Sequence, residues 1–367
     1  MAVIQGGYEE RFSAVGDALA ASLEDADVGA SVAVYLDGEL VVDVWGGYVD
    51  AERTKAWERD TITNVWSTTK TMTALCALIL ADRGVIDLAA PVARYWPEFA
   101  AAGKDTVLVR HVLSHTAGLP MWEEPTTVED LYDWPTATAR LAAQAPRWEP
   151  GTVAGYHAVT YGFLVGEIVR RVTGRSLGEF FAEEVAGPLG ADFHIGLPAE
   201  HDHRVAPVIA PPSSPSVDRI VATAFAGSPN PLIEADDGNT VAWRRAAIPS
   251  AGGFGNARSV GAVQSVLAGA GAVRGVRLLS AQGCARAWET QYHGEDRVLG
   301  GSMRYGMGYG LFGRSCGWGG WGGSLVMVDL DAGMTVSYVM NQMLDQDWLG
   351  DDRALGIVMA AYDGLAP

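Results

Sequence analysis

Lysine is almost absent from this chain. It occurs only at Lys55, Lys70 and Lys104, and apart from histidine every other positively charged side chain is an arginine. Histidine ends at His293, so the last part of the chain has neither lysine nor histidine. A lysine that stands close to a candidate nucleophile in such a chain is therefore informative.

Cysteine is also scarce, and no hydrophobic run is long. Cys76, Cys284 and Cys316 are an odd number without the spacing of a disulfide framework. We therefore expect reduced, structural cysteines and a cytoplasmic protein. Residues 1–11 lack a basic segment followed by an apolar one, so we expect no signal peptide. The longest apolar run, residues 74–81, is too short to span a bilayer.

Positive charge is outnumbered, because 26 lysines and arginines face 44 aspartates and glutamates and give a net charge of -18. Such an acidic chain is not expected to bind nucleic acid or an anionic membrane. We expect a small-molecule partner, and the oligomeric state stays open. With 367 residues, 49% of them hydrophobic, the chain can form one large two-lobed unit or two domains.

The tetrapeptide Ser67-Thr68-Thr69-Lys70 precedes a run of apolar residues. If the run is a helix, Ser67 and Lys70 lie on one face, one turn apart. Ser67 would lie in the first turn, where free N–H groups and the helix dipole favour negative charge. A lysine in an apolar setting has a lowered pKa and acts as a base. The pattern indicates an activated nucleophile, although an exposed lysine at a surface helix start gives the same four letters.

Two hairpins and a set of helices are predicted from the hydrophobic pattern. The β-rich runs 30–36 and 39–45 flank Asp37-Gly38, which is a strong hairpin signal. The runs 324–330 and 334–340 flank a second turn at residues 331–333. Helices are expected in the following segments: 9–23, from Ser67 to a C-terminal Gly84, 107–114, 161–172 ending at Gly174, and 348–362.

Strands near both ends and helices between them predict an α+β fold, in which helices flank one antiparallel sheet built from both termini. We expect residues 1–88 and 233–367 to form the lobe with the sheet. Residues 89–232 would form a mostly helical inserted lobe, whose Pro-rich loop at 205–231 covers the cleft. A cleft between the lobes is the expected ligand site.

Two further boxes follow the tetrapeptide along the chain. Tyr156 follows a turn and precedes a helical run, and Trp318-Gly319-Gly320 lies next to a strand. Together with residues 115–119 and 250–254, the three boxes in this order resemble the serine β-lactamase and penicillin-binding-protein superfamily. The pattern is most similar to that of family VIII carboxylesterases, which share the fold of class C β-lactamases, and the resemblance covers about residues 8–343.

The resemblance implies a mechanism and a set of residues. Ser67 would attack the substrate carbonyl, and Lys70 with Tyr156 would take and return the proton. The ammonium of Lys70 would lower the pKa of Tyr156. The backbone N–H groups of Ser67 and Trp321 would hold the oxyanion. No cofactor and no metal are implied, and the acyl-enzyme would be released by water or by an alcohol.

Two departures from the β-lactamase pattern favour an esterase. Trp318 stands where the family usually has the lysine of Lys-Thr-Gly, and Ala158 stands where it has an asparagine. Both usual residues bind acylamino carboxylates, and Arg314 is the nearest cation in sequence that could compensate. We expect Trp318, Gly319, Gly320 and Trp122 to contact an uncharged ester with a short- to medium-chain acyl group. An amide hydrolase of the same fold, such as a β-lactamase, D-amino-acid peptidase or linear-oligomer amidase, is the alternative, followed by a non-enzymatic binder.

Other motifs have ordinary explanations. Ser176 and Ser315 lie in Gly-x-Ser-x-Gly segments, but the nucleophile elbow requires a strand followed by a helix. Ser176 lies between two helical runs, and Ser315 precedes a strand. His157 could belong to a Ser-His-Asp triad only if one of these serines were the nucleophile. Residues 201–203, His-Asp-His, are expected to form a solvated loop rather than a metal site.

Overall fold

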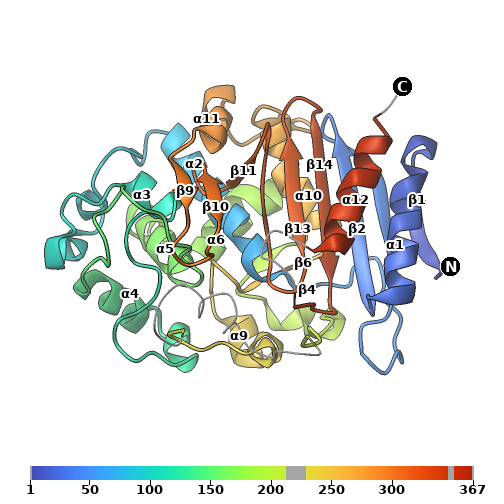
Figure 1. Cartoon of the computed structure of the whole chain (residues 1–367), viewed down its shortest axis with the longest axis horizontal. Helices are drawn as coiled ribbons and strands as arrows, with labels where there is room; N and C mark the ends of the chain where they lie inside the picture. The colour runs from blue at the N-terminus through green and yellow to red at the C-terminus, as the bar shows by residue number, and fades with distance from the viewer. Residues whose placement is uncertain (1, 212–228, 346–350, 366–367) are drawn as a thin grey trace.

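The computed structural model describes residues 2–211, 229–345 and 351–365, and it contains an antiparallel sheet to which both ends of the chain contribute (Figure 1). Both predicted hairpins are present, and their inner strands pair with each other, which joins the two ends of the chain. The order across the sheet is β1 (Ile4–Tyr8), β3 (Glu39–Gly47), β2 (Gly29–Leu36), β14 (Met334–Met340), β13 (Leu325–Asp329), β12 (Ser315–Gly319), β11 (Gly310–Phe312), β10 (Ser302–Tyr305) and β9 (Tyr292–Glu295).

Helices pack on both faces of the sheet. Neighbouring residues of a strand point to opposite faces, so two neighbours on one strand show which helix covers each face. On β14, Ser337 Oγ donates to Ala257 O at the start of α10 (Ala257–Ala268). The next residue, Tyr338, donates from its hydroxyl to Asp27, just after α1 (Ser13–Asp25). The last helix, α12 (Asp352–Asp363), lies beside α1 (Figure 1). The α+β fold predicted from the sequence is therefore confirmed.

The helix that follows the Ser67 tetrapeptide, α2 (Thr69–Asp82), lies at the centre of the molecule. Its residues from Thr69 to Ala81 are all buried, and a helix that is apolar on every side belongs in a core. Helices from the middle of the chain lie beyond it (Figure 1). The remaining helices are α3 (Val109–Leu113), α4 (Trp134–Ala143), α5 (Thr160–Thr173), α6 (Leu177–Phe181), α7 (Gly187–Leu189), α9 (Val241–Arg245) and α11 (Ala281–Ala285). Among the described helices, none is long and apolar enough to cross a membrane.

A small second sheet leads into α2. It consists of β4 (Thr63–Asn64), β6 (Gly253–Gly255) and β5 (His194–Ile195). The N–H of Val65 donates to Gly253 O, and the N–H of Gly253 donates to Thr69 Oγ1. These bonds fix the start of α2 against the segment that carries Ser250. A two-residue pairing at each strand is thus enough to bring segments about 180 residues apart in sequence into contact at the site.

Element boundaries differ from the prediction in several places. The first helical segment is interrupted, since a short 3-10 turn at Glu10–Phe12 precedes α1. The predicted segments 107–114 and 161–172 correspond to α3 and to α5, and Gly174 ends α5 with a left-handed φ of 72°. The predicted last helix begins at residues outside the described range, and its described part is α12. Most of the predicted loop 205–231 also lies outside the described residues. The division into lobes stays a prediction.

Arg353 holds α12 to the core through a buried ion-pair network. Its guanidinium lies 2.7 Å from Asp27 and also pairs with Asp351, and the three side chains are at most 6% exposed. We expect Arg353→Met to lower the free energy of unfolding by about 3–5 kcal/mol, because two buried carboxylates lose their partner. Denaturant unfolding measures the change.

The matched control is Arg314→Met, because Arg314 pairs with Asp331 at the surface and is 72% exposed. Surface pairs contribute little, so this control is expected to change the free energy of unfolding by about 0.5 kcal/mol or less. Equal effects of the two substitutions would refute the role of the buried network.

Candidate active site

Ser67 lies in a 3-10 turn, Trp66–Thr68, that continues directly into α2. The residue before it, Trp66, has a φ of 47°, a left-handed conformation that is costly for a residue with a large side chain. Trp66 is held there by packing, because the centroid of its ring lies 5.5 Å from that of Trp243 and 4.9 Å from that of Trp321. The turn presents the Ser67 hydroxyl to Lys70 and Tyr156.

Lys70 is buried and lies beside Ser67. Its Nζ is 3.0 Å from Ser67 Oγ, 2.7 Å from Ala158 O and 2.9 Å from Ser250 O. Burial lowers the pKa of Lys70 well below its usual value. A neutral amine has two N–H bonds and one lone pair. The two N–H bonds match the two carbonyls, which leaves the lone pair for the Ser67 hydroxyl.

Tyr156 completes this group from a different segment. Its Oη lies 2.8 Å from Ser67 Oγ, and the indole N–H of Trp318 donates to the same Oη at 3.1 Å. Since Oη accepts from Trp318, its own O–H is directed to Ser67. Burial raises the pKa of Tyr156, and the expected lowering by an ammonium at Lys70 is not found. The physical reason is that desolvation disfavours both the tyrosinate and the ammonium. The structure thus brings Ser67, Lys70 and Tyr156 together, and burial there lowers the pKa of Lys70 and raises the pKa of Tyr156.

Asp296 fixes the backbone of Tyr156 and was not identified from the sequence. This buried carboxylate accepts from the N–H of Tyr156 at 3.1 Å and from the hydroxyl of Tyr305 at 2.8 Å. It also accepts from the N–H groups of Val298 and Leu299, both at 2.8 Å. The hairpin of β9 and β10 thereby supports the tyrosine. A single aspartate in a Gly-rich polar stretch carries no sequence signal of this role.

The two N–H groups expected to hold an oxyanion belong to Ser67 and Trp321, and both residues line the same cavity. The tight turn that carries Trp321 is closed by Gly320, whose N–H donates to Ser324 O at 2.7 Å. Backbone N–H groups of this kind stabilise a developing oxyanion, and this role of the two residues stays a prediction.

The cavity next to Ser67 is small, about 60 Å³, and no charged side chain is among the described residues that line it. Its walls come from several separate parts of the chain, and Trp122 is one of its aromatic residues. The other lining residues, besides Ser67, Tyr156 and Trp321, are Trp66, Pro120, Met121, Ala158, Val159, Pro229, Asn230, Pro231, Ile233, Ala251 and Val298. A ligand in this cavity meets aromatic and aliphatic surface beside the nucleophile.

The Trp318-Gly319-Gly320 box packs against Tyr156 and against the segment before Ser67. Trp318 is 2% exposed, does not line the cavity, and contacts Tyr156 instead of open space. A Cβ at Gly320 would lie 2.3 Å from Val65 O, so the glycine allows β12 to approach the segment before Ser67. Gly319 ends β12, where it pairs with Leu325. Trp318 and Gly320 thus pack against Tyr156 and against the segment before Ser67, and the expected contact of the three residues with a substrate stays a prediction.

Arg314 does not compensate for the missing lysine. It precedes β12 at the strand end opposite Gly319 and pairs with Asp331 at the surface. Since a strand rises about 3.3 Å per residue, five residues place it roughly 16 Å from Gly319. No cationic side chain is among the described residues that line the cavity beside Ser67.

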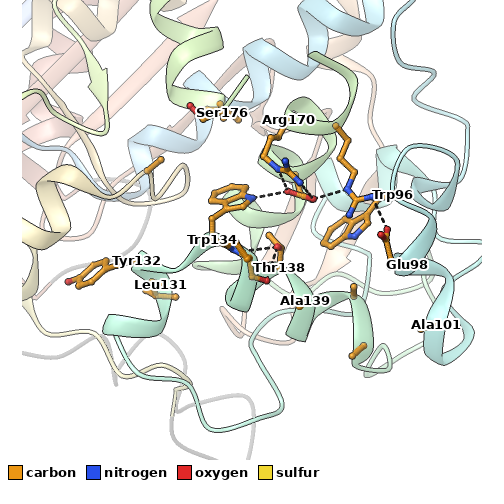
Figure 2. Close-up of a pocket in the computed structure, with 17 residues that line it drawn as sticks. Trp96, Glu98, Ala101, Leu131, Tyr132, Trp134, Thr138, Ala139, Arg170 and Ser176 are labelled. Carbon is orange, nitrogen blue, oxygen red and sulfur yellow. Dashed lines mark hydrogen bonds and ion pairs between the residues drawn. The ribbon is translucent and has the colours of Figure 1, made fainter. Parts of the chain in front are cut away.

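The rival serines have structural roles. Ser176 caps α6. Its hydroxyl donates a hydrogen bond to the side chain of Glu179 and accepts one from the Glu179 backbone N–H. It lies at the edge of a larger cavity of about 730 Å³, whose walls include Trp134 and Glu167 (Figure 2). There the carboxylate of Glu167 accepts a hydrogen bond from the indole N–H of Trp134 and forms ion pairs with Arg170 and Arg171. Ser315 lies within β12.

His157 is also structural. Its Nδ1 is 2.6 Å from Gly155 O, and its Nε2 accepts the N–H of Leu119 at 3.1 Å. Both ring nitrogens are therefore hydrogen-bonded to backbone groups.

In the segment 201–203, Asp202 pairs with Arg245, and His203 Nδ1 is 2.8 Å from Glu200 O.

Comparison with known proteins gives consistent matches over nearly the whole chain. A family model described as Beta-lactamase matches residues 17–359. The protein Esterase/beta-lactamase LipL of Mycobacterium tuberculosis is 36% identical over 361 residues, which span 92% of this chain and 83% of that protein.

Solved structures agree. A crystal structure of a family VIII carboxylesterase is 43% identical, with a TM-score of 0.92 over 99% of this chain and 100% of the other. A penicillin-binding-protein homologue from Caulobacter crescentus is 36% identical, with a TM-score of 0.89 over the same shares of the two chains. The predicted resemblance is therefore confirmed.

The chain contains only three lysines, so the state of Lys70 can be measured directly. In protein labelled with ¹³C-lysine, we expect the Cε signal of Lys70 to titrate at the lowest pH. Burial lowers the pKa of Lys104 to about 8, and the Lys70 signal should titrate below that of Lys104, because desolvation lowers the pKa of Lys70 further. Lys70→Met assigns the signal. Titration of Lys70 near the model-peptide value of about 10.4 would contradict the neutral amine.

Proposed function

The chain belongs to the beta-lactamase family, and within it we propose that this protein is a serine carboxylesterase acting on esters with small, uncharged acyl groups. Ser67 is the proposed nucleophile, Lys70 the base, and Tyr156 the acid toward the leaving group. The names of the esterase relatives support this class of reaction.

One observation carries the proposal. The cavity beside Ser67 is lined by apolar and aromatic side chains, and none of its described lining residues carries a charge. Burial of a substrate carboxylate there, without a cationic partner, would cost several kcal/mol. β-Lactams and peptides with a free C-terminus carry such a carboxylate, whereas simple esters do not. The cavity therefore fits an uncharged part of the substrate, and the lack of a cation there counts against substrates that would place a carboxylate in it.

The acylation step follows from the geometry. Ser67 Oγ attacks the ester carbonyl carbon while its proton moves to the lone pair of Lys70. The carbonyl oxygen becomes an oxyanion, which accepts from the N–H groups of Ser67 and Trp321. One such donor is worth roughly 3 kcal/mol in comparable sites. Trp318 and Asp296 are proposed as positioning residues, because both act on Tyr156 rather than on the substrate.

The leaving group departs with a proton from Tyr156. The C–O bond to the alcohol breaks, the Tyr156 O–H protonates the alkoxide, and the ammonium of Lys70 returns a proton to the tyrosinate. Water then attacks the carbonyl carbon of the acyl-enzyme and gives a proton to Lys70. The bond between this carbon and Ser67 Oγ breaks, Oγ takes the proton back from Lys70, and the acid is released. An alcohol in place of water would give acyl transfer by the same steps.

We also retain the lobe division as part of the proposal. Ser67 would come from the lobe of residues 1–88 and 233–367, and Trp122 with Tyr156 from the lobe of residues 89–232. The cavity would then lie at the boundary between the lobes, which is a common position for ligand sites.

Steady-state hydrolysis of p-nitrophenyl butyrate tests the function. We expect turnover by the wild type and a loss of at least about 10³-fold in kcat for Ser67→Ala, because no other serine is activated. Ser176→Ala is the matched control and should keep wild-type kcat. Hydrolysis of nitrocefin faster than of the ester, or full activity of Ser67→Ala, would contradict the proposal.

The pH dependence tests the proton states. Activity requires neutral Lys70, whose pKa is lowered by burial, and protonated Tyr156, whose pKa is raised. We therefore expect kcat/KM to fall as the pH is lowered through the Lys70 pKa, and no loss between neutral pH and about pH 10, where an ordinary tyrosine ionises. An acid limb centred near pH 10 would mean that Lys70 is an ordinary lysine and would contradict the mechanism.

A further inference from the structure

Two chain segments line the cavity beside Ser67. One is residues 120–126, which contributes Pro120, Met121 and Trp122, and the other is residues 229–233, which contributes Pro229, Asn230, Pro231 and Ile233. We call them the 120s wall and the 229–233 wall. Both walls bound the space into which an acyl chain can extend from the nucleophile.

The 120s wall is fixed to α4 and to the residue after it. The indole N–H of Trp122 donates to Ala137 O at 2.9 Å. The side chain of Gln144 donates to Met121 O at 2.9 Å and accepts the N–H of Glu123 at 3.2 Å. Since both ends of this wall are bonded to the same helical region, it forms a rigid support.

The 229–233 wall is tied to this support by one side chain. The amide of Asn230 donates from Nδ2 to Trp122 O at 2.8 Å and to Glu124 O at 2.6 Å, and Oδ1 accepts the N–H of Thr126 at 2.8 Å. Two acceptors face the nitrogen and one donor faces the oxygen, so all three contacts require this amide orientation.

No other hydrogen bond ties residues 229–233 to a residue that the structure describes. The wall otherwise rests on apolar contacts, with Ile233 buried in the core. The three hydrogen bonds of Asn230 therefore hold the 229–233 wall against the 120s wall.

We propose that Asn230 determines the acyl chain length of the substrate by holding the two walls together. This inference rests on the proposed esterase function and specifies its substrates. At about 60 Å³ the cavity is far smaller than the roughly 300–1,000 Å³ of pockets for drug-sized ligands. It admits a few carbon atoms beyond the carbonyl and excludes a long chain while the walls are held. The substrates are esters of short-chain acids.

The test compares p-nitrophenyl acetate, butyrate and octanoate. For the wild type we expect kcat/KM for octanoate to be at least tenfold below that for butyrate. In Asn230→Ala the walls are no longer tied, and the ratio of octanoate to acetate should rise at least tenfold. Asn230→Asp keeps the size and the Oδ1 acceptor but loses both donors, so it should shift the ratio in the same direction. It also replaces the alanine variant if that variant does not fold.

Asn239→Ala is the matched control. The Asn239 amide clamps Val208 in the same way, since Oδ1 accepts the Val208 N–H at 2.8 Å and Nδ2 donates to Val208 O at 2.9 Å. It is not among the residues that line the cavity. Loss of this clamp should change stability but leave the chain-length ratio within about twofold of wild type.

The outcomes separate the two proposals. A wild type without ester turnover overturns the proposed function. A wild type that hydrolyses esters but shows no fall from butyrate to octanoate overturns the chain-length proposal alone. The same holds if either Asn230 variant folds and keeps the wild-type ratio, or if Asn239→Ala shifts it equally. A shift confined to Asn230 variants supports the inference.

Discussion

The buried amine of Lys70 is the constraint on which the rest of the site depends. An uncharged amine can be buried at modest cost only if its N–H groups are bonded, and here they meet the carbonyls of Ala158 and Ser250. These carbonyls lie in segments 88 and 180 residues away in sequence. The remaining lone pair can only meet Ser67. The fold therefore prepares a base by satisfying the donors of one side chain and leaving its acceptor side to the nucleophile.

Close approach of backbone segments makes this possible. Gly320 lets the end of β12 contact the segment before Ser67, which places the turn at Trp321 beside the nucleophile. The same strand carries Trp318, which donates to Tyr156 from behind, while Asp296 holds the tyrosine backbone. Where the β-lactamase box usually has a lysine, this chain has Trp318, whose indole N–H donates to Tyr156.

The sequence predicted the parts that have local signals. Strong β-runs around Asp37-Gly38 and 331–333 identified the hairpins, and the order of Ser67, Tyr156 and the glycine box identified the family. It could not predict β9 and β11, which are short and rich in polar or glycine residues, nor the roles of Asp296 and Asn230. Those roles consist of contacts across 104 to 140 residues, and no pattern of neighbouring residues encodes them. The pKa of Tyr156 was expected in the wrong direction, because the effect of an ammonium at Lys70 was considered but the burial of Tyr156 itself, which raises its pKa, was not.

The central claim is that a neutral Lys70 activates Ser67 and no other serine. Intact mass and peptide mapping after reaction with a small fluorophosphonate test it most directly, because this reagent reports an activated serine whatever the natural substrate is. The account predicts one adduct per chain, located on Ser67, in the wild type, and no adduct in a folded Lys70→Met variant. An adduct on Ser176 or Ser315, or undiminished labelling of Ser67 without Lys70, would contradict it.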